Sequence, residues 1–135
     1  MKSRSDKLRR LVAVQRHMER MAEIELASTA QARQELVEKQ ENAMQAISSM
    51  EPIHAGLKNQ YALQYERHVS RDAQLEKIQE VQEKQVLREK AKGDRLNDHF
   101  LLAREGEDRE REEEGLLDLL EIRLASPASS KLDET

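Results

Sequence analysis

The sequence contains no cysteine and no tryptophan, and it has only four glycines and two prolines among 135 residues. The absence of cysteine excludes disulfide bonds and thiolate metal sites. So few glycines and prolines cannot supply the turns of a multi-stranded sheet. Aromatic residues are 2% of the chain. A globular enzyme with a closed pocket is therefore not expected.

Charged residues, by contrast, make up 37% of the chain. Alanine, glutamate, glutamine, lysine, arginine and leucine dominate, a composition typical of long solvated helices. The net charge is −4, but residues 1–20 carry +5 and residues 105–121 carry −7. Opposite charges at the two ends attract when two helices run antiparallel, whereas a parallel pair would bring like charges together.

Few residues in the sequence mark where a helix starts or ends, and those that do are easily identified. Ser3-Arg-Ser-Asp6 has the form of a capping box, which predicts a helix start near residue 4. Pro52 disfavours helix at the preceding residue, so we expect a helix over 4–50, a turn at 51–57 and a second helix over 57–124. The polar Pro/Ser stretch 126–135 is interpreted as a disordered tail.

In the first helix, apolar and small residues recur in steps of three and four, in a stripe that drifts rather than holding a strict heptad. The stripe comprises Leu8, Leu11, Val14 or Gln15, Met18, Ala22, Leu26, Thr29, Ala32, Leu36, Ala43, Ile47 and Met50. A narrow stripe of this kind is typical of a coiled coil. The sequence therefore predicts an all-α fold, an antiparallel two-helix coiled-coil hairpin over 1–125 with helices of unequal length.

Unequal lengths leave one end of the second helix without a partner. Residue i of the first helix would face roughly residue 108 − i of the second, so residues beyond about 104 face nothing. That end carries the acidic block and four leucines on one helical face: Leu116, Leu117, Leu120 and Leu124. Exposed apolar faces mark interaction surfaces. Packing within the molecule or between copies, and docking to another protein, both stay open.

No motif for catalysis or metal binding is recognised. Glu51-Pro-Ile-His54 has the spacing of a di-iron ligand pair, but a di-iron bundle needs two such motifs and the sequence has one. The carboxylates lie on solvated helices where nothing shifts their pKa values, and there is no glycine-rich phosphate loop. We expect a non-enzyme with no metal, no cofactor and no small-molecule substrate.

Two further expectations concern nucleic acid and location. The basic residues 1–20 have no aromatic residue among them for base stacking, so binding to an acidic protein is favoured over binding to nucleic acid. No apolar run approaches the roughly 18 residues that span a bilayer. The N-terminal residues lack the apolar run of a secretory signal, and together with the missing cysteines this predicts a cytoplasmic location.

The order of these segments resembles a known family. A basic start, Lys7-Leu-Arg-Arg-Leu-Val-Ala-Val-Gln-Arg16, leads into a helix rich in Ala, Glu and Gln. After the break, a longer helix opens with Tyr61-Ala-Leu-Gln-Tyr65, runs through Leu87–Arg95 and ends in the Arg/Glu block 104–114 before an Asp/Leu stretch. In architecture and size the chain is similar to the coiled-coil stalk proteins of bacterial flagellar and type III export, the FliJ/YscO type.

The resemblance implies an antiparallel coiled coil similar to the central stalk of rotary ATPases. Such stalks insert into the hexameric export ATPase, promote its assembly, contact the export gate and recycle export chaperones, and they meet the membrane only through these partners. The inserted tip would correspond to residues 104–124 together with Lys7, Leu8, Arg9, Arg10, Leu11 and Arg16. The gate contact would lie between Tyr61 and Ile78, including Tyr65.

Two other classes of function stay open. One is a self-assembling or chaperone-like structural coiled coil, which binds a copy of itself or a client helix through residues 116–124. The other is a helix pair associated with RNA or DNA, which salt-sensitive binding would reveal.

Overall fold

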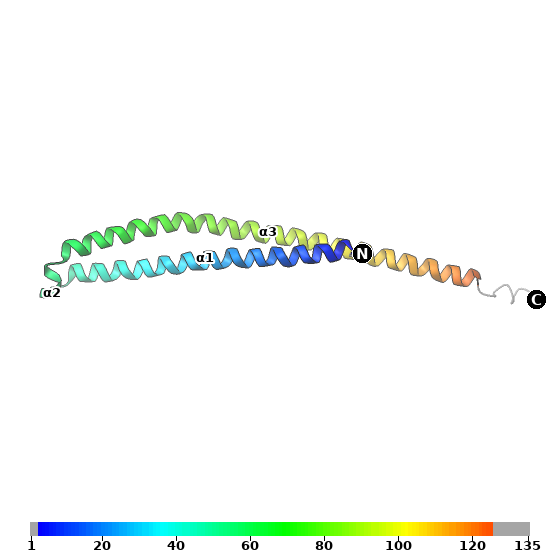
Figure 1. Ribbon diagram of the computed structural model, residues 1–135, viewed down its shortest axis with the longest axis horizontal. Helices are drawn as coiled ribbons and strands as arrows, with labels where there is room; N and C mark the ends of the chain where they lie inside the picture. The colour runs from blue at the N-terminus through cyan, green and yellow to red at the C-terminus, as the bar shows by residue number, and fades with distance from the viewer. Residues whose placement is uncertain (1–2, 126–135) are drawn as a thin grey trace, which may run out of the picture. The chain divides into compact units, whose positions relative to one another are not determined.

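The structure is a computed structural model that describes residues 3–125. It is almost entirely helical, with two long helices packed against each other (Figure 1). Helix α1 spans Arg4–Ser48, α2 spans Pro52–Ala55 and α3 spans Lys58–Ala125. No strand occurs within 3–125. The all-α prediction is therefore confirmed for this range, while the tail expected at 126–135 lies outside the described residues.

Two compact units divide the long helices between them. One unit contains Met1–Ala13 and Asp94–Thr135, and the other contains Val14–Gly93. Each unit thus takes a stretch of α1 and a stretch of α3, and each is described by itself below.

The helix ends follow from local chemistry. The hydroxyl of Ser3 accepts a hydrogen bond from the backbone N–H of Asp6 at 3.2 Å, as an N-terminal cap does. Helix α1 ends at Ser48, two residues before the predicted end. The predicted turn at 51–57 is only partly correct, because Pro52 opens the short helix α2. Proline fits the first turn of a helix, where its missing N–H would have no partner anyway.

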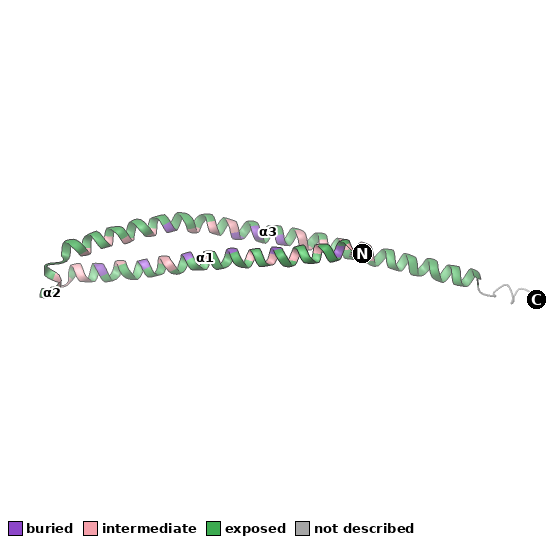
Figure 2. Cartoon of the chain, in the orientation of Figure 1, coloured by how far each residue is buried: buried purple, intermediate pink, exposed green. Residues whose placement is uncertain are grey.

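In the unit Val14–Gly93, the two helices meet along a regular line of side chains. The buried residues of α1 lie seven apart, at Gln15, Ala22, Thr29, Leu36 and Ala43. Figure 2 shows the buried and half-buried positions repeating along the facing sides of α1 and α3. Two of these five residues are polar, so the packed line, called the seam below, is not a purely apolar stripe.

This spacing agrees with part of the stripe predicted for the first helix. Ala22, Thr29, Leu36 and Ala43 were predicted inside and are buried. Of the two alternatives Val14 and Gln15, Gln15 is the buried one, because its side-chain amide donates hydrogen bonds to Glu89 of α3. Leu11 and Met18 were also predicted inside, yet they are 51% and 48% exposed.

In the other unit, the start of α1 lies against the middle of α3's C-terminal half. Ser5 is buried, and both its backbone N–H, at 3.0 Å, and its hydroxyl donate hydrogen bonds to the Glu107 carboxylate. The guanidinium of Arg9 lies 5.5 Å from the ring centre of Phe100. Every residue from 108 to 125 is exposed, as the C-terminal end of α3 in Figure 2 shows. We call residues 108–125 the C-terminal extension.

Burial is shallow throughout the described range. Within residues 3–125, no side chain is completely buried. In the same range, neither long helix contains a stretch apolar enough to cross a membrane.

Candidate partner-binding surfaces

The C-terminal extension joins an acidic stretch to a leucine-rich one on a single continuous helix. Two of its arginines pair with acidic neighbours: Arg109 lies 3.7 Å from Glu105, and Arg111 lies 3.8 Å from Asp108. The four leucines predicted to share a face are 55–86% exposed. Leu119 and Ile122 are exposed beside them, so the apolar surface is wide and nothing in the described chain covers it.

The residues of the predicted basic tip differ in their exposure and contacts. Lys7, Arg10 and Leu11 are exposed, whereas Leu8 is half-buried. Arg9 stacks on Phe100, so its guanidinium also holds α1 against α3 through a cation–π contact. Lys7 and Arg10 are therefore the residues of this group whose charges are most open to a partner.

Arg16, the last residue assigned to the tip, belongs to the other unit. Its guanidinium lies 2.8 Å from the carboxylate of Glu19. The pair sits over Gly93 of α3, where an added Cβ would lie 2.8 Å from Arg16 Nη1 and 3.4 Å from Glu19 Oε2. The absence of a side chain at Gly93 thus leaves room for this ion pair.

Tyr61 and Tyr65, assigned to a gate contact, are both half-buried. The Tyr61 hydroxyl lies 3.1 Å from His54 Nδ1, and the two rings meet edge to face with centroids 5.6 Å apart. The backbone carbonyl of His54 accepts a hydrogen bond from the backbone N–H of Leu57, in the connection after α2. The tyrosine therefore ties the start of α3 to the connection between the long helices.

Sequence reasoning missed a buried polar cluster at Gln15. The Gln15 side-chain amide donates to the backbone carbonyl of Glu89 at 3.1 Å and to the Glu89 carboxylate. Gln85 also donates to this carboxylate at 2.8 Å, and Lys92 lies 3.4 Å from it. The hydrogen bond from Gln15, aided by Lys92, holds the pKa of Glu89 below its usual value against the opposing effect of burial.

A second polar cluster crosses the helices at Arg33. Its Nε donates to Asp72 at 2.9 Å and its Nη1 to Gln79 at 3.0 Å. The hydrogen bond to Asp72 raises the pKa of the Arg33 guanidinium. Gln15 lies seven residues before Ala22 and fourteen before Thr29, and this spacing favours it over the alternative Val14.

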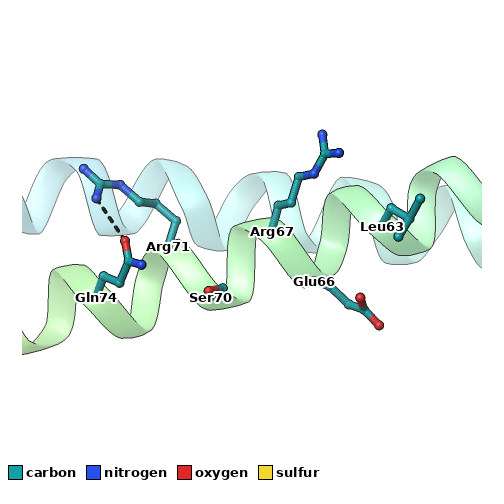
Figure 3. A pocket seen from close by; sticks show the side chains of 6 residues that line it. All are labelled: Leu63, Glu66, Arg67, Ser70, Arg71 and Gln74. Carbon is teal, nitrogen blue, oxygen red and sulfur yellow. Dashed lines mark hydrogen bonds between the residues drawn. The ribbon is translucent and has the colours of Figure 1, made fainter.

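The described part of the chain carries open grooves on its surface. The one in Figure 3 has a volume of about 330 Å³ and is lined by side chains of α3 alone, among them Arg67, Ser70 and Gln74. Arg71 donates to Gln74 at 3.2 Å along this groove. In the range 3–125, no group of three or more His, Asp or Glu side chains is placed to hold a metal ion.

Comparisons with known proteins give no relative. No family model, no curated protein and no solved structure matches the chain.

Proposed function

We propose that this protein is a non-catalytic stalk or adaptor of a flagellar or type III export ATPase, which aids ATPase assembly and the handling of export chaperones and substrates. The C-terminal extension carries the proposal. It is a helical segment that no other part of the described chain covers, with an acidic stretch followed by exposed leucines. An amphipathic helix of this kind can bind by placing its apolar face in a groove or pore of another protein.

The proposal includes an antiparallel coiled coil as the body of the stalk. Contacts across the helices support it, because partners fall in number along α3 as they rise along α1: Gln15 contacts Glu89 and Arg33 contacts Asp72. The seven-residue spacing of the seam is the repeat of coiled coils, in which single polar positions set the register. Such a body offers rigidity and no enclosed pocket.

Cross-linking tests this body directly, because the chain has no native cysteine. A short bis-maleimide reagent should join Arg33→Cys to Asp72→Cys within one molecule. The pair Arg33→Cys with Arg88→Cys should not be joined, since 88 lies about 24 Å along α3 from 72 at 1.5 Å per residue. Efficient joining of the second pair instead of the first would reject the antiparallel register.

Binding to the purified export ATPase of the same organism tests the function. We expect the full-length protein to bind the ATPase and to promote its hexamer, as measured by sedimentation and by ATP hydrolysis. Arg10→Glu should weaken binding without loss of helicity, because Arg10 is exposed and does not contact Phe100 as Arg9 does. Reversal of the exposed Lys39 is the matched control. No binding by the wild-type protein would reject the proposal.

A cytoplasmic location, at the membrane only through the export apparatus, is part of this proposal. Its partners would be the ATPase ring, the export gate and export chaperones. Cell fractionation with and without the export apparatus checks it: the protein should leave the membrane fraction when the apparatus is absent.

A further inference from the structure

Helix α1 carries an apolar surface that α3 does not cover. Val14, Met18 and Met21 follow one another in steps of four and three, and all three side chains are about half exposed. We call these residues the outer stripe. Lys7 and Arg10 precede it in the same helix, by seven and four residues from Val14. In α1, basic residues are followed by exposed apolar residues. In the C-terminal extension, acidic residues are followed by exposed leucines, so the two segments have the same order and opposite charge.

We infer that the C-terminal extension of one copy of this chain packs in parallel along the outer stripe of a second copy. The basic and apolar residues of α1 match the glutamates and leucines of the extension when residue i of α1 faces residue i + 103 of the other copy's α3. This register pairs Lys7 with Glu110, Arg10 with Glu113, Val14 with Leu117 and Met21 with Leu124. Met18 falls opposite Glu121, one residue after Leu120.

Charge selects the direction of this pairing. In the parallel direction, both basic residues meet glutamates, and Val14 and Met21 meet leucines. In the antiparallel direction that keeps Val14 opposite Leu117, Lys7 would face Leu124, and Glu113 and Glu110 would face Met18 and Met21. That arrangement places three charges against apolar side chains. Complementary charges fix register and exclude wrong partners more than they add affinity.

The four charges are available for the contact. Lys7, Arg10, Glu110 and Glu113 are exposed, and the side chains of these four make no ion pair within residues 3–125. Arg109 and Arg111 of the extension are already engaged, because they pair with Glu105 and Asp108. Glu110 and Glu113 can therefore attract a basic partner, and the start of α1 is strongly basic.

Parallel pairing of two extensions with each other is disfavoured by the same charges. In parallel it would bring Glu110 and Glu113 of both copies together, and like charges repel. Methionine side chains in the outer stripe also suit a helical partner, because they are flexible and adapt to irregular gaps. Each apolar series spans seven residue steps, about 10 Å, so the contact is small and we expect self-association to depend on concentration.

Sedimentation velocity of the full-length chain over a range of concentrations tests the inference. The wild-type protein should self-associate, less so at high salt. The double variant Lys7→Glu/Arg10→Glu and the double variant Glu110→Lys/Glu113→Lys should each associate at least about tenfold more weakly. An equimolar mixture of the two variants should associate again, because each supplies the charges that the other now lacks. Circular dichroism checks that both variants stay helical.

Two apolar variants identify the surfaces. Met18→Glu and Leu120→Glu should each weaken self-association, whereas Met44→Glu, at another exposed methionine of α1, should not. A protein that stays monomeric at all concentrations overturns the inference, as does a mixture of charge variants that fails to associate. Loss with Leu120→Glu but not with Met18→Glu would show that extensions pair with each other, which also overturns it. None of these samples contains an ATPase, so the result is independent of the proposed function.

Discussion

The side-chain amide of Gln15 in α1 donates hydrogen bonds to both the backbone carbonyl and the carboxylate of Glu89 in α3. Glu89 is only 3% exposed, so an ionised group occupies the seam where an apolar side chain would ordinarily pack. A buried polar group is costly unless its hydrogen bonds are made, and once made they hold two helices at one register.

This pair predicts a strong energetic coupling. Gln15→Leu alone should lower the thermal unfolding midpoint, because the buried carboxylate loses its cross-helix donor, and Glu89→Leu alone should lower it too. The double variant should be more stable than the sum of the two losses, since replacing both partners with apolar groups leaves nothing unsatisfied. A double-mutant cycle measures this, and the exposed pair Gln31–Glu35 is the control. Additive effects at 15 and 89 would contradict the prediction.

Stability should fall in acid because of two carboxylates. The pKa of Glu89 is lowered by Gln15, and that of Glu107 is lowered by the hydroxyl and backbone N–H of Ser5. A lowered pKa in the folded state means that the unfolded chain takes up the proton first. Stability is therefore present above the ordinary glutamate value of 4.5 and lost as pH falls through the lowered pKa.

Thermal unfolding followed by circular dichroism between about pH 5 and about pH 3 measures this loss. Glu89→Gln should flatten the dependence on pH, whereas Glu114→Gln, at an exposed residue of the C-terminal extension, should not. An equal flattening by both variants would mean that net charge, rather than the buried hydrogen bond, controls acid stability.

Leucines of α3 should differ sharply in their contribution to stability. Leu75 is 8% exposed in the seam, whereas Leu87 is 66% exposed. We expect Leu75→Ala to reduce the free energy of unfolding by about 2 kcal/mol, at the lower end for buried leucines because the surroundings are partly open. Leu87→Ala should change it by less than about 0.5 kcal/mol. Urea unfolding gives both values, and similar losses would place the seam on another face of α3.

Glycine-to-alanine replacements in α3 should separate the gain in helix propensity from the cost of a steric clash. Alanine stabilises a helix by about 1 kcal/mol relative to glycine. Gly106→Ala should gain most of this, because beyond the adjoining residues and backbone of its own helix nothing lies within 4 Å of the added Cβ. Gly93→Ala should gain less, because its Cβ displaces the Arg16 guanidinium. Adding Arg16→Ala should make the two replacements equal, and urea unfolding of the set would reveal any failure to do so.

Several features of the fold follow from the sequence because they depend on local chemistry. The hydroxyl of Ser3 caps α1 wherever α1 packs, and Pro52 stops one helix and starts the next through its own ring. The exposed C-terminal extension follows from counting residues on either side of that break. The short helix α2 was missed, because a proline that ends a helix was not also considered as the start of one.

The sequence of α1 predicted most of the seam but not its first position. The predicted stripe contains Ala22, Thr29, Leu36 and Ala43, which are buried, and it left Val14 and Gln15 as alternatives. Val14 is the more hydrophobic of the two, yet it is exposed. The choice depends on Glu89, which accepts hydrogen bonds from Gln15 although it lies far along the chain, and no periodicity in α1 records this partner.

No side chain between residues 3 and 125 is completely buried, and this has a consequence for how such a protein changes over generations. A substitution at most positions meets water rather than a closely fitted neighbour, so folding tolerates it. Only the few sites that bridge the helices resist replacement. We expect the descendants of one ancestral chain of this kind to diverge quickly in sequence while retaining the same pair of helices, with shared polar bridges as the most durable trace of kinship.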